Sequence, residues 1–320
     1  MDKTINCKQR REARRGTLGG PNRKLTVLVA VACLLAGNAG AQTCPEPKAT
    51  DFKKNILLST GLDRPVQIAV VPDGRVFIAE MYTGNIQVYK PGSATPVLAG
   101  TVAIRDENED GLLGVAAPPD FAQSHFLYVF YTDPDKTNRA HVLSRYTVTG
   151  DKLDVASKTE ILRVGRVSGG QYHAGGGIVF DEKGNLLIGT GDDTNPHSGP
   201  NDGFAPIYYK EPGKDAQKSS SNTNDLRGKI IRIHPEPALV DGKYYTIPAG
   251  NMKDAYSSFW SAAELAKVRP EIFAMGMRNP FRFTVDSKTG WVIWGDVGPD
   301  ANEDVANRGF MGHDELNVAT

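Results

Sequence analysis

The sequence contains little cysteine. Only three cysteines occur in 320 residues, and two of them, Cys7 and Cys33, lie in the first 41 residues. The remaining Cys44 has no partner further along the chain. The sequence therefore excludes an internal disulfide framework, a Cys-x-x-Cys redox pair and a cysteine-rich zinc site. We expect Cys44 to stay unpaired or to pair with a residue outside this sequence.

Signature motifs of three common enzyme classes are also missing. The sequence has no Gly-x-Ser-x-Gly elbow, no phosphate-binding P-loop and no His-Glu-x-x-His motif. These absences argue against serine hydrolases, P-loop NTPases and zinc proteases. Neither sign of charge is in excess, because 37 basic and 37 acidic residues give a formal net charge of zero. A neutral chain sets up no strong single-sign field, so we expect no nucleic-acid partner.

Long apolar runs are absent except near the N-terminus. Residues 25–36 follow a basic stretch, and Ala39-Gly40-Ala41 then offers small residues for cleavage. This order is typical of a secretory signal peptide that ends at Ala41. The run would form a helix of about 18 Å, too short to cross a hydrocarbon core of about 30 Å. We therefore predict a signal peptide over residues 1–41, a folded domain over residues 42–320, a periplasmic or secreted location and no membrane span.

Glycine and proline, by contrast, are plentiful. The 34 glycines and 20 prolines argue against long helices and favour short strands joined by turns. Residues 66–71, 75–80 and 86–89 are predicted to be three successive strands, because apolar and polar residues alternate between turn signals. Similar strand–turn–strand units recur at residues 119–131, 177–189 and 281–294.

The spacing of these units predicts an all-β propeller. Gly74 and Gly184 are 110 residues apart, and Gly184 and Gly290 are 106 apart. The unit at residues 119–131 halves the first interval. A recurrence near 55 residues is typical of propeller blades, whereas a β-sandwich needs only about 100 residues in all.

Two longer stretches do not follow the strand pattern. Residues 195–224 and 244–269 are predicted to be loops or insertions. Within the second of them, residues 261–268 are predicted to form a short helix.

Two polar segments at predicted strand ends are candidates for chemistry. His173 precedes three glycines, which let a backbone approach a ligand closely. Histidine suits a general base because its pKa lies near working pH, although His173 could instead hydrogen-bond a loop carbonyl. Glu109 precedes Asp110 and an apolar pair. It is either a ligand contact or part of a solvated acidic loop.

A third segment carries a fixed positive charge. Arg278 is followed by Asn279, and both lie just before a predicted strand. A planar guanidinium suits an anionic ligand or a developing oxyanion. An ordinary surface arginine remains the alternative.

A fourth segment offers oxygen ligands for a metal. The Gly298-Pro299 turn exposes backbone carbonyls, which are good ligands for a hard cation such as Ca²⁺, unless it is a plain turn. The pairs Asp192-Asp193 and Asp314-Glu315 are further oxygen ligands or simply solvated side chains.

The order of these segments and their amino-acid sequences resemble one family, the soluble glucose/sorbosone dehydrogenases. These are aldose dehydrogenases that depend on pyrroloquinoline quinone (PQQ). The resemblance runs from about residue 55 to the end of the sequence. It rests on residues 295–317 and on the stretches GLDRPVQIAVVPDGRVFIAE, DGLLGVAAPPDF, HAGGGIVFDEKGNLLIGTGD, LRGKIIRIH and AMGMRNPFRF. It implies a six-bladed β-propeller. Six blades need roughly 330 residues at the spacing above, so we expect the ring to be incomplete at its C-terminus.

The resemblance also implies roles for individual residues. His173 would be the general base that removes the proton of the anomeric hydroxyl. Arg278 and Asn279 would lie beside the quinone carbonyls of PQQ, with Arg278 stabilising the charge that develops there. Glu109 would face the substrate.

The implied metal is calcium. The carbonyls of Gly298 and Pro299 would bind the Ca²⁺ that polarises PQQ, and Asp314 and Glu315 would lie near a second Ca²⁺. The implied reaction is oxidation of an aldose to a lactone, with hydride transfer to PQQ. A cytochrome or a quinone would then accept the electrons. Residues 302–313 look like an insertion relative to the glucose enzymes of the family, so the resemblance does not identify the sugar.

Two alternatives belong to other functional classes. One is a non-enzymatic propeller of the same ancestry that binds carbohydrate or protein. The other is a Ca²⁺-dependent lactonase, which would hydrolyse its substrate without an electron acceptor but gives Arg278, Asn279 and His173 no clear role.

Overall fold

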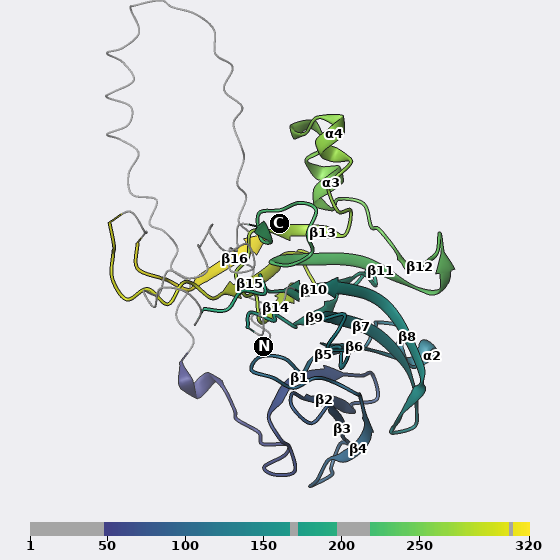
Figure 1. Cartoon of the computed structure of the whole chain (residues 1–320). Helices are drawn as coiled ribbons and strands as arrows, with labels where there is room; N and C mark the ends of the chain where they lie inside the picture. Colours follow the sequence, from purple (N-terminus) through teal and green to yellow (C-terminus); the bar gives the residue numbers. More distant parts are fainter. Residues whose placement is uncertain (1–47, 167–171, 197–217, 307–309) are drawn as a thin grey trace, which may run out of the picture. The chain divides into compact units, whose positions relative to one another are not determined.

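A computed structural model describes residues 48–166, 172–196, 218–306 and 310–320 (Figure 1). The predicted signal peptide and Cys44 therefore lie outside the described residues. The chain divides into two compact units, Met1–Asn55 and Ile56–Thr320. In the first unit, the short 3₁₀ helix η1 (Ala49–Asp51) is closed by a hydrogen bond of 2.8 Å from the Lys48 backbone N–H to the Asp51 carboxylate. All other elements belong to the second unit.

The first two sheets of the second unit are antiparallel meanders of four strands each. The first sheet contains β1 (Pro65–Val70), β2 (Val76–Glu80), β3 (Asn85–Tyr89) and β4 (Val97–Thr101). The second contains β5 (Leu112–Ala116), β6 (Phe126–Thr132), β7 (Ala140–Thr149) and β8 (Lys152–Gly165). The short helix α2 (Phe121–Ser124) connects β5 to β6. These bounds confirm the strands predicted at residues 66–89 and 126–131.

The third sheet is built around one long strand. It contains β9 (Ile178–Phe180), β10 (Leu186–Thr190), β11 (Lys229–Val240), β12 (Lys243–Thr246) and β13 (Ile272–Met275). The start of β11 pairs with β13, and its far end pairs with β12. The fourth sheet contains β14 (Phe283–Val285), β15 (Val292–Asp296) and β16 (Glu315–Ala319).

Three short helical segments interrupt the third sheet. They are α3 (Met252–Ala255), η4 (Ser257–Phe259) and α4 (Ala262–Leu265), and they fall in the predicted insertion over residues 244–269. The start of α4 is fixed by a capping box, in which Ser261 and Glu264 each bond the other's backbone N–H. The helix predicted at residues 261–268 is therefore confirmed over Ala262–Leu265, and residues 266–268 lie beyond its end. Most of the other predicted insertion, residues 195–224, lies outside the described residues.

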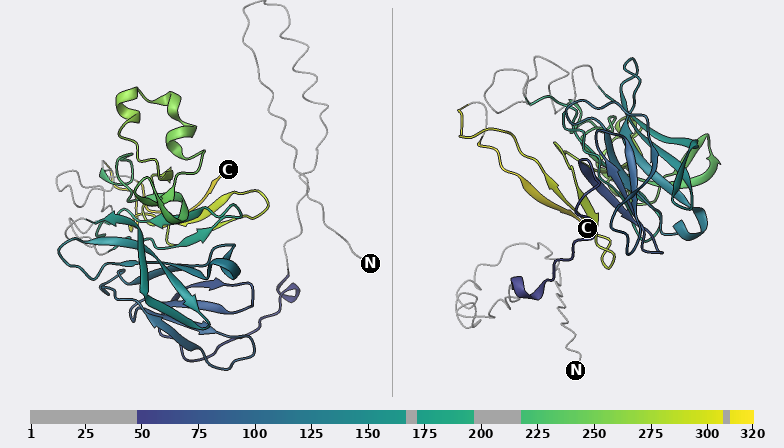
Figure 2. Two further views of the ribbon diagram at one scale, coloured as in Figure 1. Left: turned by 90° about the vertical axis from the view of Figure 1, so that its right-hand side faces the viewer. Right: turned by 90° about the horizontal axis from the view of Figure 1, so that it is seen from below.

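The four sheets follow one another as propeller blades do. Their first strands, β1, β5, β9 and β14, contact one another in succession (Figures 1 and 2). The units at residues 66–80, 177–189 and 281–294 are the first hairpins of the first, third and fourth sheets, whereas the unit at residues 119–131 contains only α2 and β6 of the second. The interval from Gly184 to Gly290 nevertheless holds one sheet rather than two, because the chain inserts β12 and the helical segments before β13. The all-β, propeller-like prediction is thus confirmed for four sheets.

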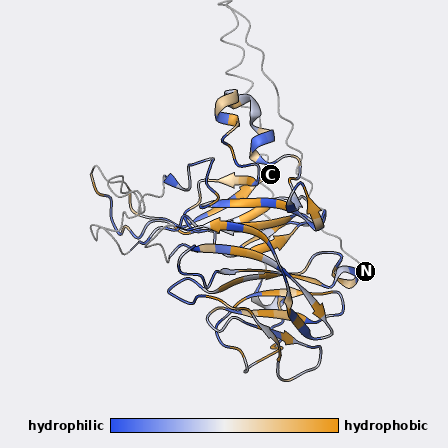
Figure 3. Ribbon diagram, turned by 45° about the vertical axis from the view of Figure 1, so that its right-hand side comes forward, coloured by the Kyte–Doolittle hydropathy of each residue, from blue (hydrophilic) through white to orange (hydrophobic). Residues whose placement is uncertain are grey.

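The core consists of apolar layers between successive sheets. The alternation of strand side chains sends neighbouring residues of β10 to opposite layers. Ile188 packs into the layer shared with the second sheet, and Leu187 into the layer shared with the fourth, beside Trp294. Phe77 and Tyr131 anchor the layer between the first two sheets. Figure 3 shows the resulting concentration of hydrophobic residues along the strands. Each fully buried side chain of this size stabilises the fold by about 1.5–3 kcal/mol.

No helix among the described residues is both long enough and apolar enough to span a bilayer.

Candidate active site

Three loops that lead into first strands bring the predicted site residues together. Glu109 precedes β5, His173 precedes β9 and Asn279 precedes β14. The side-chain oxygen of Asn279 accepts a hydrogen bond of 2.9 Å from the Gly175 backbone N–H, and its Nδ2 lies 3.4 Å from Glu109 Oε2. The same Glu109 oxygen accepts a bond of 3.2 Å from the Ala174 backbone N–H. Residues that are 65 to 170 positions apart in the sequence therefore share one site.

His173 is buried and held by a carboxylate. Its side chain is 3% exposed, and its Nδ1 lies 2.7 Å from Asp192 Oδ1 and 3.0 Å from Thr194 Oγ1. A carboxylate only accepts hydrogen bonds, so Nδ1 carries a proton and donates to Asp192, and Nε2 is the nitrogen that can offer a lone pair. The partner of Nδ1 is thus a side chain rather than the loop carbonyl considered from the sequence. This arrangement suits a base at Nε2 whose ring orientation is fixed by the hydrogen bond of Nδ1.

Asp192 has a role that the sequence did not indicate. It is fully buried, and its Oδ1 also accepts bonds from the Thr194 backbone N–H and hydroxyl, at 2.9 and 2.6 Å. Its other oxygen, Oδ2, is buried without a hydrogen-bond partner in the described part of the chain. The sequence signal is the strand-ending run Gly191-Asp192-Asp193, which by itself predicts only an oxygen ligand or a solvated side chain.

Gly191 allows the two loops to touch. A Cβ atom at this position would lie 1.8 Å from the His173 carbonyl oxygen, well inside van der Waals contact. Any side chain here would therefore separate His173 from Asp192. The glycine is required by the close approach of two backbones at the site.

Arg278 lies beside this pair with part of its guanidinium unused. The Arg278 and Asn279 backbone N–H groups donate to the Asp296 carboxylate, at 3.0 and 2.7 Å. The Arg278 side chain is 11% exposed, and its Nη2 forms a long ion pair of 3.9 Å with the exposed Asp300 carboxylate. Its Nε and Nη2 are buried without hydrogen-bond partners among the described residues. Because these donors are not hydrogen-bonded, an anionic or carbonyl oxygen of a ligand fits this position.

Asp296, at the end of β15, is a site residue that the sequence reasoning missed. Burial raises its pKa above the usual value, and the negative charges of Asp192 and Glu315 raise it further, against the two backbone donors. Burial is thus the main reason for the raised pKa, and the neighbouring carboxylates add to it. A cationic or hydrogen-bond-donating ligand would stabilise the charged form of Asp296.

The predicted metal ligands do not form a cluster of acidic side chains. The Gly298 backbone N–H donates to Asp314 Oδ1 at 3.0 Å. A Cβ at Gly298 would lie 2.1 Å from the His313 carbonyl oxygen, so these two segments are in direct contact. In the described ranges, no group of three or more His, Cys, Asp or Glu residues is arranged to hold a metal ion. A Ca²⁺ ion at this place would therefore depend mainly on backbone carbonyl oxygens as ligands.

A buried ion network supports the Glu109 loop. Asp110 is fully buried, and Arg105 Nη2 lies 2.6 Å from its carboxylate, which also pairs with Arg166. Burial alone would raise the pKa of Asp110. The hydrogen bond from His141, the charge of Arg166 and the hydrogen bond from Arg105 outweigh burial, so the pKa is well below its usual range.

Arg166 joins the two sides of the site. Its Nε donates to Asp193 Oδ1 at 2.6 Å, while its Nη1 binds Asp110. Asp193 follows Asp192, and Asp110 follows Glu109. The guanidinium therefore ties together the loop of Asp192, the partner of the candidate base, and the loop of Glu109, the candidate substrate contact.

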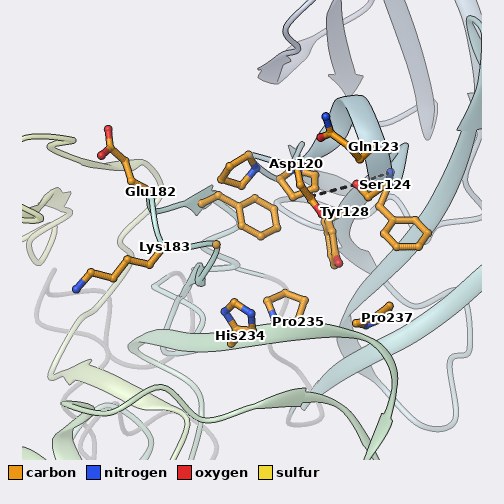
Figure 4. A pocket seen from close by; sticks show the side chains of 14 residues that line it. Asp120, Gln123, Ser124, Tyr128, Glu182, Lys183, His234, Pro235 and Pro237 are labelled. Atoms are coloured by element: carbon orange, nitrogen blue, oxygen red, sulfur yellow. Dashed lines mark hydrogen bonds between the residues drawn. The ribbon is translucent and has the colours of Figure 1, made fainter.

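A separate pocket of about 560 Å³ lies at the opposite ends of the first strands (Figure 4). It opens between the second and third sheets, and it is lined by Asp120, Tyr128, Lys183 and His234 among others. None of the candidate active-site residues Glu109, His173, Asp192, Arg278 and Asn279 lines it. The predicted site is therefore distinct from this pocket.

Comparison with known proteins gives a family match over most of the chain. Residues 62–319 match the family described as Glucose / Sorbosone dehydrogenase. The chain is 22% identical over 252 residues to the aldose sugar dehydrogenase YliI of Escherichia coli, covering 78% of this chain and 57% of that protein. It is 24% identical over 269 residues to quinoprotein glucose dehydrogenase B of Acinetobacter calcoaceticus, covering 81% of this chain and 51% of that protein.

The chain also resembles solved structures and a protein whose name refers to an interaction rather than to catalysis. The PQQ-bound aldose sugar dehydrogenase of Streptomyces coelicolor aligns with a TM-score of 0.57 at 22% identity, covering 84% of this chain and 63% of that one. Hedgehog-interacting protein of Mus musculus is 26% identical over 245 residues, covering 71% of this chain and 31% of that protein. The chain spans 57% and 51% of the two dehydrogenases above, little more than half their length.

Proposed function

The chain belongs to the glucose/sorbosone dehydrogenase family, and from this premise we propose that it oxidises an aldose sugar at the anomeric C1 hydroxyl to a lactone. The observation that carries the proposal is the buried pair of His173 and Asp192, at 2.7 Å. The pair lies beside Asn279 and Glu109, which come from two other sheets. An oriented base among polar groups is what removal of a proton from a sugar hydroxyl requires.

His173 is the proposed general base. Its Nε2 accepts the proton of the C1 hydroxyl while the hydride leaves C1, and the Asp192 carboxylate stabilises the imidazolium that results. A positioned base contributes typically about 10²–10⁴-fold in rate. Glu109 is the proposed substrate contact. Its Oε2 is held by Ala174 and lies near Asn279, which leaves Oε1 for a sugar hydroxyl.

PQQ is the proposed cofactor, and when bound it would supply the acceptor for the hydride. Arg278 and Asn279 are the residues that would hold it. The support is the guanidinium of Arg278, whose buried Nε and Nη2 make no hydrogen bond in the described part of the chain, although Nη2 lies 3.9 Å from the exposed Asp300 carboxylate. Donors at this position would also stabilise negative charge on a ligand oxygen.

Calcium and an electron acceptor complete the proposal. The backbone carbonyls of Gly298 and Pro299 would bind one Ca²⁺, and Asp314 and Glu315 would lie near a second. The support is the type of ligand, since Ca²⁺ binds carbonyl and carboxylate oxygens. A cytochrome or quinone would accept the electrons. Residues 1–41 support a periplasmic or secreted location.

Six sheets are the proposed number in the complete ring. Ile68 and Val70 are exposed on β1 of the first sheet, and Leu316 and Val318 are exposed on β16 of the last. In the inner layers the same kinds of side chain are covered by a neighbouring sheet. Further sheets on these two faces would bury them and close the ring.

Reconstitution of the purified chain with PQQ and Ca²⁺ tests the function. Reduction of a dye would be followed with a panel of aldoses. We expect activity that His173→Ala lowers by about 10²–10⁴-fold. His234→Ala is the control, because His234 lines the pocket at the other ends of the strands and activity should be unchanged. Equal activity in wild type and His173→Ala would contradict the assigned base.

A second candidate function is non-enzymatic binding of carbohydrate or protein. The likeness to Hedgehog-interacting protein favours it, since that protein is named for an interaction. The same reconstitution separates the two candidates. A binding module would retain no quinone and show no visible quinone absorbance.

A further inference from the structure

Lys229, the first residue of β11, is a buried cation that the proposed chemistry does not use. Its side chain is fully buried, and its Nζ donates to three backbone carbonyls. The acceptors are Ser219 at 2.8 Å, Ser220 at 2.9 Å and Arg227 at 2.7 Å. An ammonium has three N–H donors, so all three are used on backbone. Among the described residues, no ion pair includes Lys229.

The turn that Lys229 holds contacts both halves of the candidate site. The Ser219 hydroxyl donates to the carbonyl of Asp192 at 3.0 Å, and Asp192 is the partner of the candidate base. The Ser220 hydroxyl donates to the carbonyl of Met277 at 2.7 Å, directly before Arg278. One ammonium thus fixes two serines whose side chains reach the two functional loops.

The contact between these segments is tight. The Gly228 backbone N–H donates to Gly191 at 2.8 Å, and the Met277 backbone N–H donates to Gly228 at 3.2 Å. A Cβ atom at Gly228 would lie 2.4 Å from the Ser220 hydroxyl oxygen and 2.6 Å from the Met277 carbonyl oxygen. Close-packed segments transmit a displacement rather than absorb it. Movement of the serine turn would therefore move the loops of Asp192 and Arg278.

We propose that Lys229 is a positioning residue for the oxidation. Through Ser219 and Ser220 it holds the Asp192–His173 pair and Arg278 in the correct positions relative to each other. The proposal rests on the proposed function, because that function assigns the base and the cofactor contact. Three converging carbonyls need three donors, and an apolar side chain of similar length leaves all three unbonded. Burial lowers the pKa of Lys229 to about 8, so the ammonium keeps its three protons at neutral pH.

The test compares two buried cations that both serve backbone carbonyls. Lys229→Met removes the cation at the serine turn. Arg145→Met is the matched control, since Arg145 is also buried and donates to the carbonyls of Glu236 and Pro237, at 2.8 and 3.1 Å. The readout is the ¹⁵N–¹H spectrum of the His173 ring in the full chain, assigned with His173→Gln. It requires no turnover and no cofactor.

We expect the Nδ1–H signal of His173 to shift or disappear in Lys229→Met and to stay in place in Arg145→Met. With PQQ loaded, kcat of Lys229→Met should fall about 10–100-fold, as expected when a reacting group is misplaced by about 1 Å. An unchanged His173 signal in Lys229→Met overturns the proposal, as does the same change in both variants. Absence of activity in the wild type would instead count against the proposed function.

A second pair of variants covers the case in which Lys229→Met does not fold. Ser219→Ala and Ser220→Ala each remove one hydroxyl and leave the ammonium in place. Ser219→Ala should change the His173 signal, because it frees the carbonyl of Asp192. Ser220→Ala should weaken PQQ binding more than it changes that signal, because it frees the segment before Arg278. Wild-type behaviour in both variants overturns the proposal.

Discussion

Asp192→Asn isolates the electrostatic part of the proposed base. The substitution keeps the size of the side chain, and the amide oxygen can still accept from His173 Nδ1, at 2.7 Å in the wild type. What is lost is the negative charge that stabilises the imidazolium when His173 takes the proton. Rate and stability should therefore respond differently to this change.

The size of the rate effect follows from the charge pair. The centres of the carboxylate and imidazolium charges lie roughly 4 Å apart, which gives about 4 kcal/mol at an effective dielectric constant of about 20. Each 1.36 kcal/mol is tenfold in rate, so the upper bound is about 10³-fold. The amide dipole keeps part of this interaction. We expect kcat to fall about 10²–10³-fold on the same scale.

Stability should hardly change in the same variant. Asp192 Oδ2 has no hydrogen-bond partner in the described ranges, so the wild type buries a charge that is only partly compensated. Replacing it with a neutral amide should alter the free energy of unfolding by no more than about 1 kcal/mol. Asp193→Asn gives the contrast. It removes a buried partner of Arg166 and should cost about 3–5 kcal/mol of stability.

The assay measures kcat by dye reduction and the free energy of unfolding by chemical denaturation, for both variants. A kcat of Asp192→Asn within threefold of wild type would refute the reasoning. So would a loss of kcat that merely follows a loss of folded protein.

Three further predictions concern acid stability, loop contact and cofactor binding. The pKa of Asp110 is lowered in the folded chain, so its contribution to stability is present above about pH 4 and is lost as the pH falls toward the folded value. Denaturation midpoints should therefore drop in acid for wild type and drop less for Asp110→Asn, which is already destabilised at pH 7. Gly191→Ala should abolish activity while the far-ultraviolet circular dichroism spectrum keeps its β character, because the Cβ separates the His173 and Asp192 loops. Arg278→Met should weaken PQQ binding at least tenfold in an absorbance titration, since it removes a charged hydrogen-bond donor; unchanged affinity would place the cofactor elsewhere.

The strands could be predicted because their signals are local. Alternation between turn residues located β1, β2 and β3 within one or two residues. The same pattern located β6 and the first hairpins of the third and fourth sheets. The Ser261–Glu264 capping box likewise lies within four consecutive residues. The extent of the third sheet could not be predicted in this way. Its long strand β11 pairs with β12 and, across the helical insertion, with β13.

The candidate site could be predicted only in part, because some of its residues have a local sequence signal and others do not. His173 and Arg278 stand out because glycines flank them, and Glu109 and Asn279 stand beside such segments. Asp192 and Asp296 gain their importance only from contacts made across loops, at 2.7 Å to His173 and 2.7 Å to the Asn279 backbone. No sequence pattern marks such contacts.

Lys229 is the residue of the proposed site that the sequence indicates least. It lies in the run LRGKIIRIH, whose pattern predicts only a polar residue at the start of a strand. Full burial follows from the packing of β10, β11 and β13 around it, together with a turn that supplies three carbonyl acceptors. A buried lysine can be recognised only once those acceptors are in place.

The most direct test of the central claim is the rate at which an aldose reduces bound PQQ in a single turnover. Stopped-flow absorbance would compare an ordinary aldose with the same sugar deuterated at C1, in wild type and in His173→Ala. We predict slower reduction of the quinone by the deuterated sugar in wild type, and a rate at least about 10²-fold lower in His173→Ala. No reduction of bound PQQ by any aldose, or equal rates in the two proteins, would contradict the account.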